Sequence, residues 1–292
     1  MLLDQGVSQQ KKSELHLGRF VLDYSDKALV MGILNRTPDS FYDGGKYKTK
    51  SCAVDAAYRM VHEGADIIDI GGQSTRPGSN PVITEEELER IIPIIEEIAG
   101  KIDVPISVDT SNHAVAEESL KRGAVLINDI TGLKGDEKMA GVVSKYGAGV
   151  VLMHIKGTPK DMQNDPAYDN LIEEIISYLR DSVQIGINAG IPHEKMIIDP
   201  GIGFGKAEEH NLSIINRLSE FKQLGKPILI GVSRKSFIGS TLKLAVDERV
   251  FGTAACVALS IANGANIVRV HDVKQMKEIA RMTDAIAREG RL

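Results

Sequence analysis

The chain has 292 residues, of which 42% are hydrophobic and 26% charged, so it can bury one large core or two smaller ones and remain soluble. It has no tryptophan, only 4% aromatic residues and a formal net charge of −5. This composition argues against a surface that stacks nucleobases or attracts polyanions, and any anion site must be a local basic cluster.

Residues 1–18 are polar and lack an apolar signal core, and no apolar run in the chain approaches the ~20 residues that span a bilayer. The two cysteines, Cys52 and Cys256, each lie in an apolar run. Buried free thiols are typical of a reducing compartment. We therefore expect a cytoplasmic protein that binds neither membranes nor nucleic acid.

From residue 28 onward, short runs rich in β-branched residues alternate with amphipathic helical stretches. Most of the runs are apolar without polar alternation, which is typical of strands that are covered on both faces. Eight strands are predicted in this way, at Ala28–Leu34, Asp66–Ile70, Pro105–Val108, Val125–Asn128, Gly149–Met153, Lys195–Ile198, Pro227–Gly231 and Asn266–Val270.

Three of the intervening helices stand out, at Thr84–Ala99, Leu171–Ala189 and Arg249–Ala262. The first begins with Thr84 and Glu87, which have the spacing of a capping box. Several helices end at a glycine directly before the next strand, as helix C-termini commonly do. This punctuation sets the boundaries of regular β–α units.

Eight β–α units in about 260 residues predict an α/β protein built as a (β/α)8 TIM barrel, for which ~250 residues is typical. An open doubly wound sheet is the structural alternative. Residues 1–27 are expected to form an N-terminal extension with a short hairpin, Leu15–Leu17 and Phe20–Tyr24, that plugs the bottom of the barrel. Residues 28–292 would then form a single domain.

Polar side chains follow all eight predicted strands. Because the carboxyl ends of barrel strands converge on one mouth, where active sites of this fold are found, we expect these side chains to share one site. They are Asn35, Arg76, Asp109, Asn128, His154, Asp199, Lys235 and the pair Arg269 and His271.

Four of these residues suit a heterocycle that is rich in N–H donors. Asp109, Asn128 and Asp199 offer acceptors from three different strands, and Lys235 offers a donor for a ring carbonyl or imine nitrogen. Asp109 precedes Thr110 and Ser111, so it could instead serve only as a helix cap.

Other members of the set suit an anion. Arg76, Arg269 and His271 form a cationic edge on a net acidic chain, as a phosphate-bearing group would need. Asn35 is a neutral oxygen ligand that could hold Mg2+ when phosphate oxygens and water complete the shell. His154 is interpreted as a core histidine with a satisfied hydrogen bond.

Three alternative active-site motifs fail on inspection. The run 201–207 resembles a phosphate-binding P-loop, but Pro200 replaces the first glycine and Ala207 replaces the Ser or Thr that would bind Mg2+. The seven histidines are scattered, which argues against a catalytic zinc site. No G-x-S-x-G motif is present, and Ser233 lacks local signs of a triad.

Together the motifs resemble the dihydropteroate synthase family of pterin-binding enzymes, from Ala28 to Met282. A single motif would be weak support, whereas their joint occurrence in order and at matching strand ends is specific. The stretches that carry the resemblance are 32–45 (GILNRTPDSFYDGG), 69–78 (DIGGQSTRPG), 107–110 (SVDT), 127–130 (INDI), 153–159 (MHIKGTP), 199–206 (DPGIGFGK), 233–239 (SRKSFIG) and 269–272 (RVHD).

The resemblance implies a transferase that joins 6-hydroxymethyl-7,8-dihydropterin diphosphate to p-aminobenzoate and releases pyrophosphate, with Mg2+ as cofactor and a homodimer as the assembly. It implies that Asn35 binds Mg2+ and that Ser40, Phe41, Pro77 and Ser236 bind p-aminobenzoate. Catalytic roles fall to Asp39, Lys235, Arg269 and His271. The pterin diphosphate would be bound by Thr75, Arg76, Asp109, Asn128, Met153, Asp199, Phe204, Lys235, Arg269 and His271.

The chain departs from the commoner family pattern at Arg36, at Gln73 and at Ile155-Lys156. Arg36 lies in the first loop, and we expect it to face solvent or the diphosphate. Two other functions stay open on the sequence: a catalytically weak paralogue that binds pterins, and a pterin-dependent methyltransferase. The complete runs 37–41 and 74–77 favour the active synthase.

Overall fold

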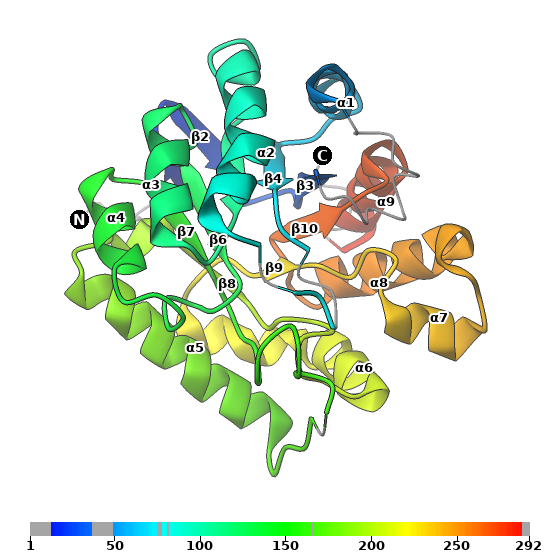
Figure 1. Cartoon of the computed structure of the whole chain (residues 1–292). Helices are drawn as coiled ribbons and strands as arrows, with labels where there is room; N and C mark the ends of the chain where they lie inside the picture. The colour runs from blue at the N-terminus through cyan, green and yellow to red at the C-terminus, as the bar shows by residue number, and fades with distance from the viewer. Residues whose placement is uncertain (1–12, 37–48, 75–77, 81, 165, 288–292) are drawn as a thin grey trace, which may run out of the picture.

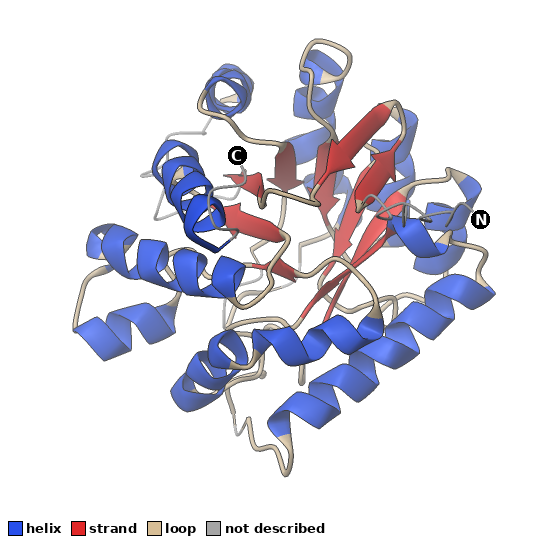
Figure 2. Cartoon of the chain, turned by 180° about the vertical axis from the view of Figure 1, so that it is seen from behind, coloured by secondary structure: helices blue, strands red, loops and turns tan. Residues whose placement is uncertain are grey.

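The computed structural model describes residues 13–36, 49–74, 78–80, 82–164 and 166–287. Its centre is a ring of eight parallel strands in the order β8-β7-β6-β5-β4-β3-β10-β9. A further parallel bridge between Ile198 and Ile228 connects β8 to the segment that leads into β9. The expected (β/α)8 barrel is confirmed, and the open doubly wound sheet is wrong. Helices surround the strands on the outside (Figures 1 and 2).

The strands of the barrel are β3 (Leu29–Asn35), β4 (Ile67–Gly71), β5 (Ile106–Asp109), β6 (Leu126–Asp129), β7 (Gly149–Met153), β8 (Met196–Asp199), β9 (Leu229–Ile230) and β10 (Ile267–Val270). The helices are α1 (Lys50–His62), α2 (Thr84–Ile98), α3 (His113–Lys121), α4 (Met139–Lys145), α5 (Leu171–Asn188), α6 (Glu208–Asn216), α7 (Ser236–Leu242), α8 (Val250–Ala262) and α9 (Val273–Ala287), with 3₁₀ turns at His193–Lys195, Leu218–Leu224 and Val246–Glu248.

The predicted strands agree with the observed ones to within one residue at each end, except at β9. The expected strand Pro227–Gly231 is reduced to Leu229–Ile230. Pro227 has no N–H to donate, and the Ile228 N–H donates to the side-chain oxygen of Asn266 at 3.0 Å rather than to a strand carbonyl. At Ile228 a hydrogen bond to the Asn266 side chain therefore takes the place of a backbone hydrogen bond between strands.

The capping box predicted at Thr84 and Glu87 is wrong. Ile83 occupies the N-cap position of α2 without a side-chain cap, and Thr84 is the first helical residue. The Thr84 hydroxyl instead accepts a hydrogen bond from Asn112 Nδ2 at 2.7 Å, and Glu87 is buried. A long-range partner has displaced the local one. By contrast, the glycines expected to end helices do so: Gly123 and Gly264 both have φ of 110°, which a residue with a Cβ rarely adopts.

The N-terminal hairpin is formed by β1 (Glu14–Leu17) and β2 (Phe20–Asp23). Leu15 and Leu17 are fully buried. They pack in a cluster with residues from every barrel strand except β5. The other buried members are Leu29, Met31, Ile67, Leu126, Val151, Ile197, Leu229 and Ile267. These residues lie near the amino ends of the strands, so the hairpin closes the end of the barrel opposite the mouth, as expected.

Both described cysteines are free, but the expectation that both are buried is wrong for Cys52, which is exposed. The neighbouring residues Ala53 and Val54 of α1 are buried in the hydrophobic core instead. Cys256 is partly buried, and burial raises the pKa of its thiol to about 11. In the described part of the chain, no helix has the length and apolarity to cross a membrane.

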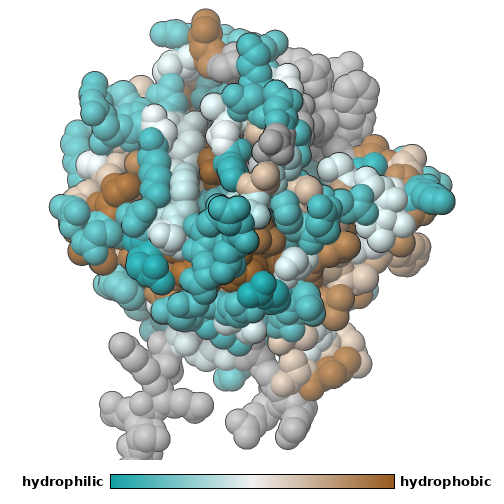
Figure 3. Space-filling model, turned by 90° about the horizontal axis from the view of Figure 1, so that it is seen from below, coloured by the Kyte–Doolittle hydropathy of each residue, from teal (hydrophilic) through white to brown (hydrophobic). Residues whose placement is uncertain are grey.

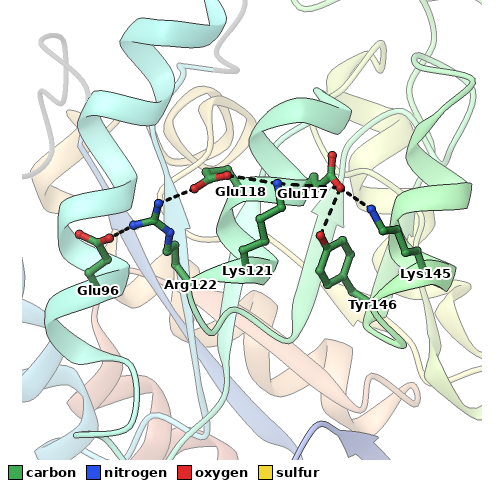
Figure 4. A network of polar contacts seen from close by, with 7 residues as sticks. All are labelled: Glu96, Glu117, Glu118, Lys121, Arg122, Lys145 and Tyr146. Carbon is green, nitrogen blue, oxygen red and sulfur yellow. Dashed lines mark hydrogen bonds and ion pairs between the residues drawn. The ribbon is translucent and has the colours of Figure 1, made fainter.

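A network of ion pairs joins three successive outer helices (Figure 4). Arg122, which directly follows α3, contacts Glu96 of α2 as well as Glu118, and Lys145 of α4 lies 2.7 Å from Glu117 of α3. Pairs that are open to solvent contribute little each, since water and salt screen them. The network therefore links the three helices to one another but contributes little to the free energy of unfolding.

Candidate active site

A chain of buried charges crosses the mouth of the barrel from β10 to β5. Arg269 Nε lies 2.6 Å from Asp69 Oδ2, and Arg269 Nη2 lies 2.6 Å from Asp109 Oδ2. Asn128 Nδ2 donates to the same Asp69 oxygen at 3.1 Å. Four strands, β4, β5, β6 and β10, thus contribute to one polar cluster at their carboxyl ends.

The cluster holds two carboxylates against one guanidinium. Burial raises the pKa of the Asp109 carboxyl to about 7, Arg269 opposes this rise, and the neighbouring Asp69 carboxylate adds to it. Burial acts to lower the pKa of Arg269, but Asp69 and Asp109 outweigh it and raise that pKa overall. The guanidinium therefore stays charged, and Asp109 holds a proton at higher pH than an ordinary aspartate does.

Two acceptor atoms of this cluster are buried without a partner. Among the described residues, Asp69 Oδ1 and Asp109 Oδ1 have no hydrogen-bond donor. An orphaned buried oxygen costs free energy, so native proteins leave few of them without a ligand or water to satisfy them. The site is built to receive N–H donors from a bound molecule.

A second pair of electrostatically coupled groups is formed by Asp199, which ends β8, and Lys235, which directly precedes α7. Burial raises the pKa of Asp199, against the charge of Lys235, and burial lowers the pKa of Lys235 to about 8, against the charge of Asp199. The Lys235 ammonium also donates to the Ile202 carbonyl and lies 4.6 Å from the centre of the Phe204 ring. Lys235 thus sits between an acid and an aromatic face, where it can meet a flat ring.

The loops after β9 and β10 are joined by polar contacts. Ser233 Oγ lies 2.9 Å from His271 Nδ1 and accepts from the His271 N–H at 3.2 Å. Arg234 makes a bidentate pair with Asp272, at 2.8 and 2.7 Å. These contacts place His271 beside the start of α7, where Ser236 is exposed.

The structure brings together several of the residues predicted from the sequence. Contacts or electrostatic coupling link Asp109, Asn128, Asp199, Lys235 and Arg269 at the mouth, with Phe204 beside Lys235. Met153 is buried in a small cluster to which Phe204 also belongs. The predicted residues Asp39, Ser40, Phe41, Thr75, Arg76 and Pro77 lie outside the described residues.

Three functional candidates were missed by the sequence analysis. Asp69 carried no assigned role, although an aspartate within the apolar run Ile-Ile-Asp-Ile of β4 was a usable signal. Glu87 is 1% exposed, burial raises its pKa, and its Oε1 has no partner among the described residues. Lys206 is 2% exposed and contacts His154. His154 itself is buried and hydrogen-bonded, so its interpretation as a core histidine is confirmed.

Arg36 is partly exposed, as one part of the expectation for it allowed, but its guanidinium contacts the backbone of α2. Its guanidinium donates to the Glu89 carbonyl at 3.2 Å and to the Arg90 carbonyl at 2.7 Å, both in α2. Pro93 lies inside α2 and has no N–H to donate to Glu89, four residues earlier. Arg36 therefore supplies a donor that the helix lacks.

This geometry makes the effects of Arg36 and Pro93 interdependent. We expect Arg36→Val to lower the free energy of unfolding by about 1–2 kcal/mol, since a charged donor to a carbonyl is lost. In a Pro93→Ala background the backbone N–H gained at that position restores the helical bond, so the same change should cost less than half as much. Urea unfolding of the four proteins measures this coupling, and strictly additive costs would contradict it.

Comparison with known proteins places this site in a family. A model of the pterin binding enzymes matches residues 31–271. A dihydropteroate synthase of Bacillus subtilis is 48% identical over 278 residues, which cover 94% of each chain. Among solved structures, the Yersinia pestis dihydropteroate synthase in complex with a sulfonamide drug superposes with a TM-score of 0.91 at 43% identity, covering 94% of this chain and 98% of that one.

A further solved structure is similar over almost the same length. Dihydropteroate synthase from Clostridium difficile, solved in the presence of pteroic acid, has a TM-score of 0.85 and 46% identity, and the match covers 91% of this chain and 98% of that one. Relatives with this name therefore match along almost the whole barrel, which favours the synthase over the methyltransferase. This chain belongs to the pterin-binding enzyme family and, within it, to the dihydropteroate synthases.

Proposed function

We propose that this chain condenses 6-hydroxymethyl-7,8-dihydropterin diphosphate with p-aminobenzoate to give 7,8-dihydropteroate and pyrophosphate. The observation that carries the proposal is the buried acceptor set at the barrel mouth, with Asp109 Oδ1 lacking a partner among the described residues. A pterin ring offers N–H donors to such a set. Membership in the dihydropteroate synthase family supports the same chemistry.

The ring would lie between the two charged pairs. Asp109, Asn128 and Asp199 accept its N–H groups, while Lys235 donates to its carbonyl or imine nitrogen. Lys235 lies over the Phe204 ring, so a pterin ring bound beside them would contact both a cation and an aromatic side chain. Met153, buried in the cluster against which Phe204 packs, would add apolar contact.

The diphosphate is assigned to the cationic residues of the mouth. Arg269 lies in β10, and His271 comes directly after that strand. Thr75 and Arg76, which lie outside the described residues, complete the proposed set. Because two carboxylates already balance Arg269, we infer that it acts mainly by holding Asp69 and Asp109 in place, and that Arg76 carries more of the phosphate charge. Replacing Arg269 and Arg76 in separate variants and comparing their affinities for the diphosphate tests this assignment.

Mg2+ fits the residues present. Asn35 ends β3 beside Gly71, and a Cβ on Gly71 would lie 2.9 Å from Asn35 Oδ1, so glycine leaves that oxygen accessible. Mg2+ would be held through this one amide oxygen together with water and substrate phosphates. When bound, the ion would neutralise charge on the departing pyrophosphate.

Catalysis then rests on positioning and on charge. Breaking the C–O bond leaves positive charge on the pterin methylene and negative charge on the leaving group, and the p-aminobenzoate amine attacks that carbon. Asp199 and Asp109 stabilise the ring as it becomes cationic, and Asp39 is proposed to orient the amine. Ser236, with Ser40, Phe41 and Pro77, is proposed to hold p-aminobenzoate at the exposed start of α7.

We also propose that the protein is a homodimer. Large apolar side chains are exposed on α7, α8 and α9, and Phe251 is 84% exposed. Figure 3, seen from below, shows hydrophobic residues on the right-hand side, where α7 and α8 lie in Figure 1. A second copy would cover this face. A cytoplasmic location is proposed on the basis of the two free cysteines.

The direct test is pyrophosphate release from the pterin diphosphate with Mg2+, with and without p-aminobenzoate. Release that depends on p-aminobenzoate and yields dihydropteroate is the expected result. Tight pterin binding without such turnover would contradict the proposal and identify a non-catalytic pterin-binding protein instead.

Binding of the pterin ring should release a proton. In the free protein burial raises the pKa of Asp109 to about 7, whereas an N–H donor from the ring favours the ionised carboxylate and lowers that pKa. Below pH 7 the proton must leave before the ring binds, so affinity should rise with pH and level off above about 7. Calorimetry at pH 6 in two buffers of different ionisation enthalpy measures the release. Identical heats in both buffers would contradict it.

A further inference from the structure

Lys206 connects two strand ends beneath the pterin site. It ends the loop between β8 and α6, and it is 2% exposed. Its Nζ lies 2.9 Å from His154 Nδ1 and donates to the Phe204 carbonyl at 3.0 Å. His154 follows β7, and its backbone N–H donates to the Asp199 carbonyl at 2.9 Å.

The same loop is held tightly against the segment after β7. Tyr168 donates its hydroxyl to the Gly205 carbonyl at 2.7 Å. A Cβ on Gly201 would collide with the His154 carbonyl, and one on Gly205 would collide with the Lys156 carbonyl, so the two backbones are in direct contact. Within the loop, the Gly201 N–H donates to Asp199 Oδ1 at 2.7 Å. A shift of the loop would therefore move the Asp199 carboxylate as well.

Burial shifts the pKa of both Lys206 and His154. Burial lowers the pKa of Lys206 well below its ordinary value, against the pull of Asp199, and burial lowers the pKa of His154 to about 2. A neutral His154 that accepts at Nδ1 carries its proton on Nε2, and Lys206 is then the donor of the contact.

We propose that Lys206 is a positioning residue of the pterin-ring site, which fixes the loop after β8 by bonding His154 and the Phe204 carbonyl. The fixed loop sets the Phe204 ring beside Lys235 and orients the Asp199 carboxylate toward the ring. Lys206 touches neither substrate nor reacting atoms in this role. The inference rests on the proposed function, because it assigns the pterin ring to Asp199 and Phe204.

The test measures the affinity of 6-hydroxymethyl-7,8-dihydropterin, which lacks the diphosphate and so reports on the ring site alone. Lys206→Met keeps the apolar stem and removes the donors, and we expect it to raise the Kd about tenfold, as the loss of one such bond would. The KM of p-aminobenzoate should stay within about twofold, since its proposed contact Ser236 belongs to α7 and not to this loop. The matched control is Lys160→Met, an exposed lysine of the preceding loop, which should leave both values unchanged.

A conservative variant separates positioning from bulk packing. His154→Asn keeps an acceptor near the Nδ1 position and should retain most of the affinity, whereas His154→Leu should match Lys206→Met. If Lys206→Met does not fold, Tyr168→Phe removes only one hydroxyl from the same loop and should weaken ring binding by a smaller factor.

Unchanged ring affinity in folded Lys206→Met overturns the inference, and so does an equal loss for both substrates, which would indicate general loosening. If the unaltered protein itself fails to bind the ring, the proposed function fails and the role of Lys206 falls with it. Binding by the unaltered protein and by every variant alike would overturn only the inference.

Discussion

Lys235→Ala is expected to lower kcat/KM by about 10²–10³-fold, the cost of removing one donor aimed at charge that develops in the transition state. Lys235 lies between Asp199 and Phe204, and burial holds its pKa at about 8, so its charge is available to the ring at low cost in solvation. The loss should appear in kcat as well as in KM, because the contact strengthens as the C–O bond breaks. Pyrophosphate release at saturating p-aminobenzoate measures it.

The control for this experiment is Lys274→Ala, an exposed lysine of α9. It changes the net charge by the same amount and should leave kcat/KM unaltered. Near-normal kcat/KM in Lys235→Ala would mean that the ring site is misassigned.

The second large effect concerns stability. Arg269→Met should lower the free energy of unfolding by about 3–5 kcal/mol, because it leaves Asp69 and Asp109 buried without their cation. For a chain of this size the loss corresponds to a fall in Tm of about 10 °C. Arg269 opposes the rise in the pKa of Asp109, so its loss should raise that pKa further, and the fall in Tm, measured by thermal unfolding, should grow as the pH rises through and beyond 7. At pH 6 a proton on the pair compensates part of it.

Two variants sharpen this measurement. Arg217→Met breaks the exposed pair with Glu220 and should leave Tm unchanged within error, because solvent screens that pair. Asp69→Asn in the Arg269→Met background removes one of the unpaired charges and should recover part of the lost Tm. A drop in Tm for Arg269→Met no larger than that for Arg217→Met would show that the buried cluster is not stabilising.

Much of the barrel was predictable because its signals are local. Apolar runs bounded by polar residues and glycines located seven strands to within one residue at each end. The eighth, β9, was predicted too long because the Ile228 N–H is taken by the side chain of Asn266. The capping box at Thr84 failed for a similar reason, since Asn112, 28 residues away, provides the partner that the local motif would have supplied.

The sequence by itself determined the strand order, the (β/α)8 barrel, the hairpin over its lower end and several of the polar side chains at its mouth, because periodicity and residue type are written in neighbouring positions. Only the tertiary structure decided which of those side chains pair. Arg269 meets Asp69, 200 residues away, and Asp109, 160 residues away, while Arg36 turns to the carbonyls of α2. Such contacts depend on the closure of the barrel and on burial, which no local pattern records.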